Sequence, residues 1–229
     1  MDSLSPFALW KWEDTLAHWQ MFASGLGFTL GVSILALILA GVIGVISGMM
    51  ATGKIAILRY CSRIYVEVFQ NTPLVIQLFF LYFALPPMGI NLDVFTIGVL
   101  GIGAYHGAYM SEVVRSGINS IPKGQFEAAT SQGFSYIEQM MYIILPQSIK
   151  IILPPATNQA VNLIKNSSVL LIIAGAELMY MSDSYASDSL NYATSYSVAG
   201  ILYFIMCFPL AMWARNYEEK LKNAHLTRN

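Results

Sequence analysis

Few residues in this sequence could do chemistry, and the clearest pattern among them is a partial phosphate-binding loop. Residues 48–54 read GMMATGK, which fits most of the pattern G-x4-G-K-[ST]. The final position is Ile55, which has no hydroxyl group for Mg²⁺, and a long apolar segment rather than a strand precedes the pattern. We interpret it as a helix end whose lysine reaches toward the membrane surface. If ATP drives this protein, another chain must bind the ATP.

Residues that could form a catalytic or metal centre are scattered. The three histidines, His18, His106 and His225, are far apart, and the sequence has no H-E-x-x-H or G-x-S-x-G pattern. The two cysteines, Cys61 and Cys207, have no metal-ligand spacing, and we interpret them as buried thiols. We therefore expect a protein that is not an enzyme and binds no metal or cofactor itself. His106 is the one histidine in an apolar segment, where it either packs or lines a path.

The composition is that of an integral membrane protein. Of the 229 residues, 56% are hydrophobic and 11% are charged, whereas a soluble domain has about 25% charged residues. The net charge of −1 leaves no basic face for nucleic acid. A membrane-spanning helix needs about 20 apolar residues, and the candidate segments are 22–52, 64–86, 94–113, 138–180 and 194–214. We therefore predict an all-α membrane protein with about five transmembrane helices in a single domain, residues 1–229.

Prolines and small residues predict how these segments are shaped and packed. Prolines are expected to break the fourth segment, 138–180. In the first segment, small residues recur four positions apart, at Gly27 and Gly31 and again at Gly44 and Gly48. This spacing predicts close approach to a neighbouring helix.

The distribution of lysine and arginine predicts the orientation in the membrane. One side carries basic residues after the first, third and fifth segments, whereas the other side carries Lys11 with Asp93, Asp183 and Asp188. The basic residues are Lys54, Arg59, Arg63, Arg115, Lys123, Arg215, Lys220, Lys222 and Arg228. With five spans, we expect the N-terminus outside and the C-terminus in the cytoplasm. The loop between spans three and four, 119–146, is then also cytoplasmic.

The 119–146 loop is expected to fold as two short helices around a turn. Pro122 is suited to a helix start and Gly133 to a left-handed turn. An apolar patch facing the cytosol is expected on these helices, formed by Phe126, Ala129, Phe134 and Ile137. Such a patch is typical of a protein-binding surface, and equally typical of an amphipathic connector that lies on the lipid surface.

A resemblance to a known family decides between these alternatives. Glu127, Ala128, Ala129 and Gly133, followed by I-x-L-P at 143–146, resemble the EAA signature of bacterial ABC importer permeases. The flanking sequence resembles the subfamily for polar amino acids, with GAYMSEVVRSGINSIPKGQ at 107–125 and YVEVFQNTPLVIQLFFLYF at 65–83. The resemblance extends over most of the chain, from residue 25 to residue 220.

The resemblance implies a transport role that depends on other chains. In that family the loop is a coupling helix that docks on a cytoplasmic ATPase dimer, and Glu127, Ala128, Ala129 and Gly133 would be its docking residues. ATP and Mg²⁺ then belong to the ATPase, whose closure switches the permease between inward and outward access. The other implied partners are a second permease copy or a similar permease, an extracytoplasmic amino-acid-binding protein and the lipid bilayer. The implied location is the bacterial cytoplasmic membrane, as a multi-pass protein.

Polar residues inside apolar segments are candidates for the substrate path, because they are costly in a membrane. Two polar clusters interrupt the second and fourth segments, and both suggest broken helices whose backbone groups could hold a zwitterion. Hydrogen bonding between helices is the alternative use of these clusters. Glu112 and Arg115 share a helix face, where a salt bridge is expected ahead of ligand contact. The candidate path residues are Asn71, Thr72, Gln77, Glu112, Lys165, Asn166, Ser167 and Ser168.

The charge of the second cluster suggests the substrate. Relatives that carry basic amino acids or glutamine resemble Lys-Asp-Thr-Ser here, whereas this chain has Lys165 followed by Asn166 and two serines. Loss of the acid leaves Lys165 less neutralised, which favours an anionic side chain. We therefore expect glutamate or aspartate, with glutamine or another polar amino acid as the alternative. A secondary amino-acid transporter is a more distant alternative, since it would need an inverted repeat and more spans.

Overall fold

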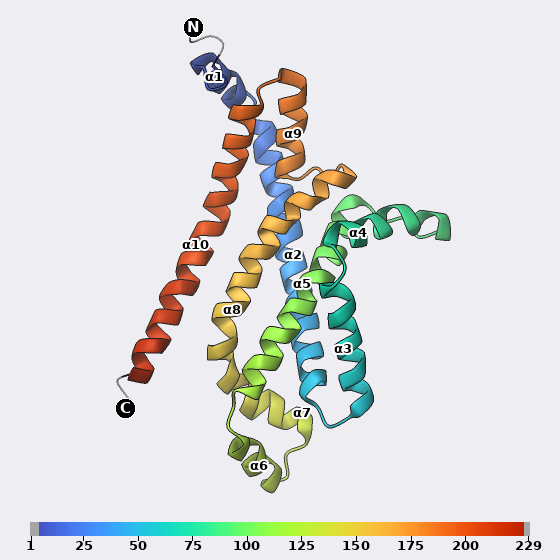
Figure 1. Cartoon of the computed structure of the whole chain (residues 1–229), viewed down its shortest axis with the longest axis vertical. Helices are drawn as coiled ribbons and strands as arrows, with labels where there is room; N and C mark the ends of the chain where they lie inside the picture. Colours follow the sequence, from blue (N-terminus) through green and yellow to red (C-terminus); the bar gives the residue numbers. More distant parts are fainter. Residues whose placement is uncertain (1–4, 227–229) are drawn as a thin grey trace. The chain divides into compact units, whose positions relative to one another are not determined.

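The computed structural model describes residues 5–226, with side chains through residue 221, and within this range the chain is helical and contains no strand. Arg228 lies outside the described residues, and the side chains of Lys222 and His225 lie outside the described side chains. In chain order (Figure 1) the elements are α1 (Leu9–Ala17), α2 (Trp19–Thr52), α3 (Ala56–Gln70), α4 (Leu74–Phe79), η2 (Phe80–Ala84), η3 (Pro86–Met88), α5 (Val94–Asn119), α6 (Lys123–Ser131), α7 (Tyr136–Glu138), η4 (Gln139–Ile144), α8 (Leu145–Asn166), η5 (Ser167–Ile173), α9 (Leu178–Ser189) and α10 (Tyr192–Leu226).

Two to four membrane spans are supported by helix length and composition. Helices α2 and α10 each qualify alone, and they contain the predicted segments 22–52 and 194–214. Two further helix pairs qualify if each bent pair counts as one span. The first is α3 with the helix made of α4 and η2, and the second is the continuous helix from α7 to η5 with α9. Helix α5 is not among them, because its glycines, tyrosines and His106 lower its hydropathy. The helical membrane class is confirmed, whereas the five-span topology stays a prediction.

Both helix breaks lie at polar clusters, one of which contains Pro73, whereas the two prolines inside α8 break no helix. The expectation that prolines break the fourth segment is wrong, since Pro154 and Pro155 lie inside α8, which continues to Asn166. Membrane helices tolerate proline where neighbouring groups satisfy the freed carbonyls. The helix changes instead at η5 and ends at Ala174, which has φ 53°. The second predicted break is confirmed, because α3 ends just before Asn71 and a new helix begins after Pro73.

Large apolar side chains are exposed along the candidate spans. On α2, Ile34, Ile38 and Val42 are each more than half exposed, as expected for a helix that faces lipid. The same exposure corrects the interpretation of the cysteines as buried thiols, because Cys61 is exposed and Cys207 is half-buried. An apolar sequence environment indicates burial in a water-soluble core, but in a membrane helix it is equally compatible with a lipid-facing surface.

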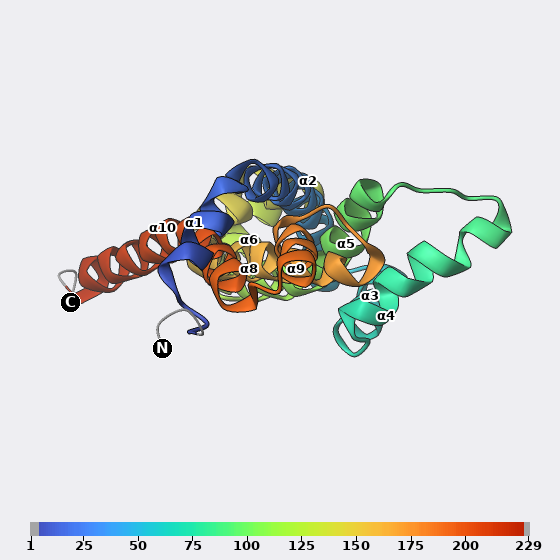
Figure 2. The ribbon, with the colours of Figure 1, turned by 90° about the horizontal axis from the view of Figure 1, so that it is seen from above.

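The chain contacts divide into two compact units, and α2, α5, α8 and α10 each begin in one unit and continue into the other. Unit 1 comprises the described parts of 1–36, 74–102 and 162–209. In it, α1 lies beside the first turns of α10 (Figure 2), where Thr15 and Thr194 share a buried hydrogen bond of 2.7 Å. Tyr185 on α9 donates to Asp14 at 2.7 Å. Glu177, which is fully buried, caps α9 by accepting from two of its backbone N–H groups.

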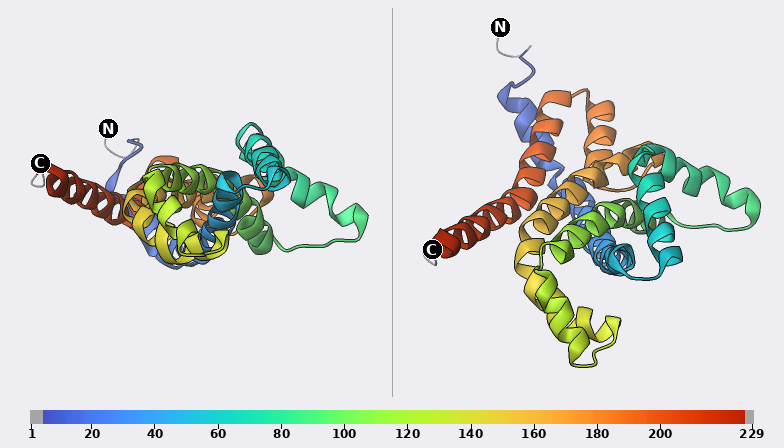
Figure 3. Two further views of the ribbon diagram at one scale, coloured as in Figure 1. Left: turned by 90° about the horizontal axis from the view of Figure 1, so that it is seen from below. Right: turned by 60° about the horizontal axis from the view of Figure 1, so that its bottom comes forward.

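Unit 2 comprises the described parts of 37–73, 103–161 and 210–229. In it, α2 packs closely on α5, as the small-residue spacing predicts for Gly44 and Gly48, whose added Cβ atoms would lie 2.5 Å from Met110 and 2.7 Å from Val114. The α6–α7 loop extends from the ends of α5 and α8 (Figure 3). An apolar core joins the loop to these helices, formed by Val114, Ile118, Ile121, Met140 and Ile144.

The close approach of α2 and α5 gives a stability prediction. Gly48→Leu is expected to destabilise the protein by roughly 1–3 kcal/mol, because the added side chain must displace Val114 and the α5 backbone. Gly41→Leu is the matched control, since a Cβ added at that position on the same helix meets nothing within 4 Å. Thermal unfolding in detergent checks this difference. Equal melting temperatures for the two variants would contradict the packing described here.

Candidate functional site

The 119–146 loop folds as two short helices around a glycine turn, as predicted. Helix α6 begins immediately after Pro122 and ends at Ser131. Gly133 then adopts φ 84°, a left-handed conformation that favours glycine. This turn lets the Phe134 N–H donate to the Ala129 carbonyl at 3.2 Å, which closes the helix end. Helix α7 starts with a reciprocal capping box, in which the Ser135 and Glu138 side chains each accept from the other residue's backbone N–H group.

The predicted apolar patch on this loop is wrong, because most of it faces inward. Ala129 is 1% exposed, and Phe126 and Phe134 are half-buried, so that only Ile137 is largely exposed, at 66%. The two helices pack against the apolar core that Val114, Ile118, Ile121, Met140 and Ile144 form. The burial of their side chains in this contact is not visible in the sequence of the loop. The outward face of α6 is therefore polar and small, and it includes Glu127 and Ala128.

A tyrosine connects the loop to the end of α2. The Tyr136 hydroxyl donates to the Met49 carbonyl at 2.7 Å and lies 3.0 Å from the Thr52 hydroxyl. Within the loop, the Gln139 amide donates to Thr130 at 3.0 Å and to the Phe134 carbonyl at 2.9 Å. These bonds link the loop to the end of α2 and hold its two helices together.

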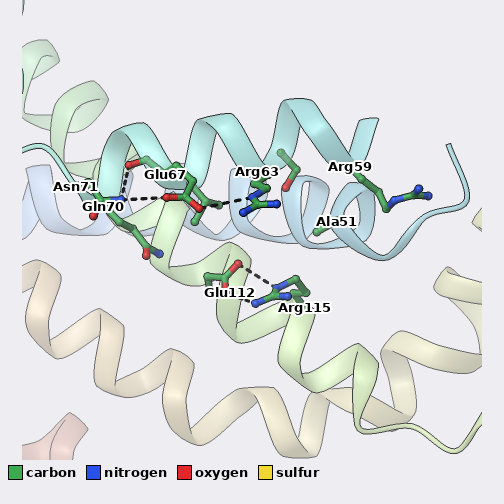
Figure 4. A pocket seen from close by; sticks show the side chains of 10 residues that line it. Ala51, Arg59, Arg63, Glu67, Gln70, Asn71, Glu112 and Arg115 are labelled. Atoms are coloured by element: carbon green, nitrogen blue, oxygen red, sulfur yellow. Dashed lines mark hydrogen bonds and ion pairs between the residues drawn. The ribbon is translucent and has the colours of Figure 1, made fainter. Parts of the chain in front are cut away.

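A polar cavity of about 440 Å³ lies between α3, α5 and the end of α2 (Figure 4). Glu112 and Arg115 form the predicted salt bridge, with Arg115 Nε donating to Glu112 Oε1 at 3.0 Å. Arg63 Nε lies 3.6 Å from Glu67 Oε1, and Asn71 Nδ2 donates to the backbone carbonyl of Glu67 at 2.8 Å. The lining residues are Ala51, Arg59, Ser62, Arg63, Val66, Glu67, Gln70, Asn71, Glu112 and Arg115.

The cavity brings together two of the predicted path residues, Asn71 and Glu112. Both belong to unit 2, as does Thr72, whereas Gln77 and the cluster 165–168 belong to unit 1. In that cluster, the Ser167 and Ser168 hydroxyls each donate to a backbone carbonyl one turn earlier, at 2.7 Å. Such bonds satisfy hydroxyls at the point where α8 changes to η5.

Three arginines and a second glutamate of the cavity were not predicted as path residues. Arg59, Arg63, Glu67 and Asn71 are spaced four apart along α3, which puts them on one helix face. That spacing in a membrane helix is the signal that could have identified them. His106, the histidine of the third apolar segment, is 2% exposed and has a hydrogen bond with Gln159, so the structure favours the packing alternative.

Known proteins similar to this chain are transport permeases. Residues 40–223 match the family described as binding-protein-dependent transport system inner membrane component. The probable glutamine ABC transporter permease protein GlnM of Bacillus subtilis (strain 168) is 38% identical over 208 residues, which cover 91% of this chain and 96% of GlnM. The putative glutamine transport system permease protein GlnP of Rickettsia bellii (strain RML369-C) is 39% identical over 194 residues, covering 84% and 89%. A crystal structure of an amino acid ABC transporter with histidines has 31% identity and a TM-score of 0.81, over 91% of this chain and 98% of that one.

Proposed function

The chain belongs to the family of binding-protein-dependent transport system inner membrane components, and we propose that it forms the path by which glutamine enters the cell. It is the permease of an amino-acid ABC importer, a multi-pass protein of the bacterial inner membrane that is itself not catalytic. The family implies an ATPase and a substrate-binding protein as partners. The observation that most supports the mechanism is the exposed α6 of a loop that Tyr136 ties to α2.

The loop is the coupling element in this proposal. Glu127, Ala128 and Gly133 are exposed and contact the ATPase dimer, while Ala129 is buried and supports α6 from within. The ATPase holds ATP and Mg²⁺, and its closure pulls the loop, which moves the end of α2 through Tyr136. The work of the permease is then the differential stabilisation of two conformations. A second copy or a similar permease completes the path.

The proposed topology has five spans in one domain, residues 1–229, with α5 as the third span. The N-terminus is then outside, and the C-terminus and the 119–146 loop are cytoplasmic, because the basic residues gather on that side. A tag at the C-terminus is expected to resist membrane-impermeant reagents in sealed cells and to react after permeabilisation. Labelling of the tag in sealed cells would show that the topology is the reverse of the proposed one, with the loop outside the cell and out of reach of the ATPase.

Glutamine is favoured over glutamate and aspartate. Two similar permeases are named for glutamine, and the cavity of this chain combines arginine, glutamate and amide side chains. Such a lining offers partners for the carboxylate, the ammonium and the neutral amide of glutamine. ATP hydrolysis by the reconstituted importer, measured with single amino acids, separates the substrates. Stimulation is expected to be strongest with glutamine and weaker with glutamate, whereas stimulation by glutamate or aspartate alone would favour an anionic substrate, as the charge of Lys165 suggests.

A substitution beside Lys165 tests whether the charge of this cluster selects the substrate. Asn166→Asp adds a negative charge beside Lys165 and is expected to lower the uptake of glutamate relative to glutamine by roughly fivefold, which corresponds to about 1 kcal/mol. Asn158→Asp is the matched control, because Asn158 is an exposed amide on the same helix. Competition between the two labelled amino acids in proteoliposomes measures this ratio. An unchanged ratio would remove the 165–168 cluster from substrate selection.

A further inference from the structure

An apolar groove lies where the coupling loop meets α2 and α3. It has a volume of about 490 Å³, which is in the range of sites that hold small molecules. Its walls come from the end of α2, the start of α3 and α7. The lining residues are Ile46, Met49, Met50, Gly53, Lys54, Ile55, Leu58, Ser135, Tyr136 and Ile137, of which Lys54 alone is charged. The groove therefore suits a ligand with a long apolar part and a negative charge at one end.

The groove is continuous with the lipid-facing surface of α2. Ile38, Val42 and Ile46 are 59%, 53% and 55% exposed and follow one another at four-residue spacing along this candidate span. Ile46 is both the last of this row and part of the groove wall. At the other side of the groove, Ile55 and Ile137 are 58% and 66% exposed. Because an exposed apolar row on a spanning helix faces acyl chains, the groove is filled from the bilayer rather than from water.

The turn that carries Lys54, the charged residue of the groove wall, is held by hydrogen bonds from Arg59. The Arg59 guanidinium donates to the Gly53 and Lys54 carbonyls, both at 2.8 Å. These bonds hold the short turn that carries Lys54, while the Arg59 side chain itself lines the polar cavity and not the groove. Basic residues that flank a spanning helix attract anionic lipid headgroups. A phosphodiester at this turn would meet Lys54 while its acyl chain enters the apolar part of the groove.

We propose that this groove binds one anionic phospholipid, with an acyl chain against Ile46, Met50 and Leu58 and its phosphate at Lys54. Tyr136, which ties the coupling loop to α2, forms part of the groove wall. The bound lipid therefore touches the element that carries force between the loop and the span. Occupancy stiffens this connection, so that the importer responds to the anionic lipid content of its membrane.

Native mass spectrometry of the assembled importer, titrated with phosphatidylglycerol or phosphatidylcholine, tests the proposal. Lys54→Glu is expected to weaken phosphatidylglycerol binding by roughly five- to tenfold and to leave phosphatidylcholine unaffected, since each lysine near a membrane surface contributes about 1 kcal/mol. Lys220→Glu is the charge control, because Lys220 is an exposed cation outside the groove. Ile46→Trp is expected to reduce binding of both lipids, and Ile38→Trp, at equal exposure on α2, to reduce neither.

The outcomes that would overturn the proposal are specific. Phosphatidylglycerol binding that is unchanged in both Lys54→Glu and Ile46→Trp would show that the groove does not hold the lipid. Wild-type protein that binds phosphatidylcholine as tightly as phosphatidylglycerol would exclude a headgroup contact at Lys54. Phosphatidylglycerol that binds the permease alone but not the assembled importer would show that the groove belongs to the ATPase interface. None of these results depends on which amino acid is transported.

Discussion

Gly133→Val is expected to reduce amino-acid uptake by at least about tenfold, while the protein still reaches the membrane. Gly133 holds φ 84°, a region that costs an L-residue roughly 1–2 kcal/mol and is still less accessible to a β-branched side chain. The turn between α6 and α7 must therefore rearrange, which displaces Glu127 and Ala128 from their positions relative to Tyr136. Because the loop is exposed and local, the spans themselves stay folded.

Uptake and membrane abundance are measured in the same cells for this variant. The matched control is Gly200→Val, since Gly200 is an exposed helical glycine on α10 where an added Cβ meets nothing within 4 Å. The control is expected to transport normally. Normal uptake by Gly133→Val would contradict the coupling role of the loop, whereas loss of both variants from the membrane would show that folding, rather than coupling, is sensitive.

Ala51→Trp is expected to reduce uptake by about tenfold or more by filling the polar cavity. Ala51 lies in the last turn of α2 and lines the cavity opposite the charged faces of α3 and α5 (Figure 4). An indole at this position occupies space that a hydrated zwitterion would need, and it offers no group for the carboxylate or the ammonium. Assembly with the ATPase should be unaffected, because the docking face of α6 is not part of the cavity.

Ala56→Trp provides the comparison, as Ala56 is an exposed alanine on α3 that does not line the cavity. Labelled glutamine uptake by reconstituted importers, normalised to the amount of assembled complex, measures the effect of both substitutions. Wild-type uptake by Ala51→Trp would place the substrate path elsewhere. Equal loss in both variants would indicate a general cost of a tryptophan at this end of the protein.

Features that depend on a few neighbouring residues could be predicted from the sequence. The turn at Gly133 follows from the lack of a Cβ, and the helix break after Gln70 follows from a polar cluster that contains Pro73. The close approach at Gly44 and Gly48 is predicted from small-residue spacing, but the same spacing does not produce it at Gly27, where an added Cβ would meet nothing within 4 Å. The Glu112–Arg115 pair follows from helical spacing. The turn, the helix break and the ion pair each depend on a physical rule that acts within four neighbouring residues.

Features that depend on distant partners could not be predicted. Phe126 turns inward because it packs against a core that Val114 and Ile118 of α5 form together with Met140 and Ile144, which lie more than ten residues further along the chain. The prolines of α8 do not break it, since a helix in a packed membrane protein can satisfy freed carbonyls through its neighbours. Each arginine of the cavity, taken alone in the sequence, is an ordinary surface residue. The arginines line one common cavity only because α3 lies opposite α5.

ATP-dependent uptake of labelled glutamine into proteoliposomes tests the central claim most directly. The vesicles contain this permease with its ATPase, and the binding protein is added outside with glutamine. Uptake is expected only when ATP is enclosed with the ATPase, and it should stop when either the ATPase or the binding protein is omitted. Glutamine uptake that continues without the ATPase or without ATP would contradict the account and would indicate a secondary transporter instead.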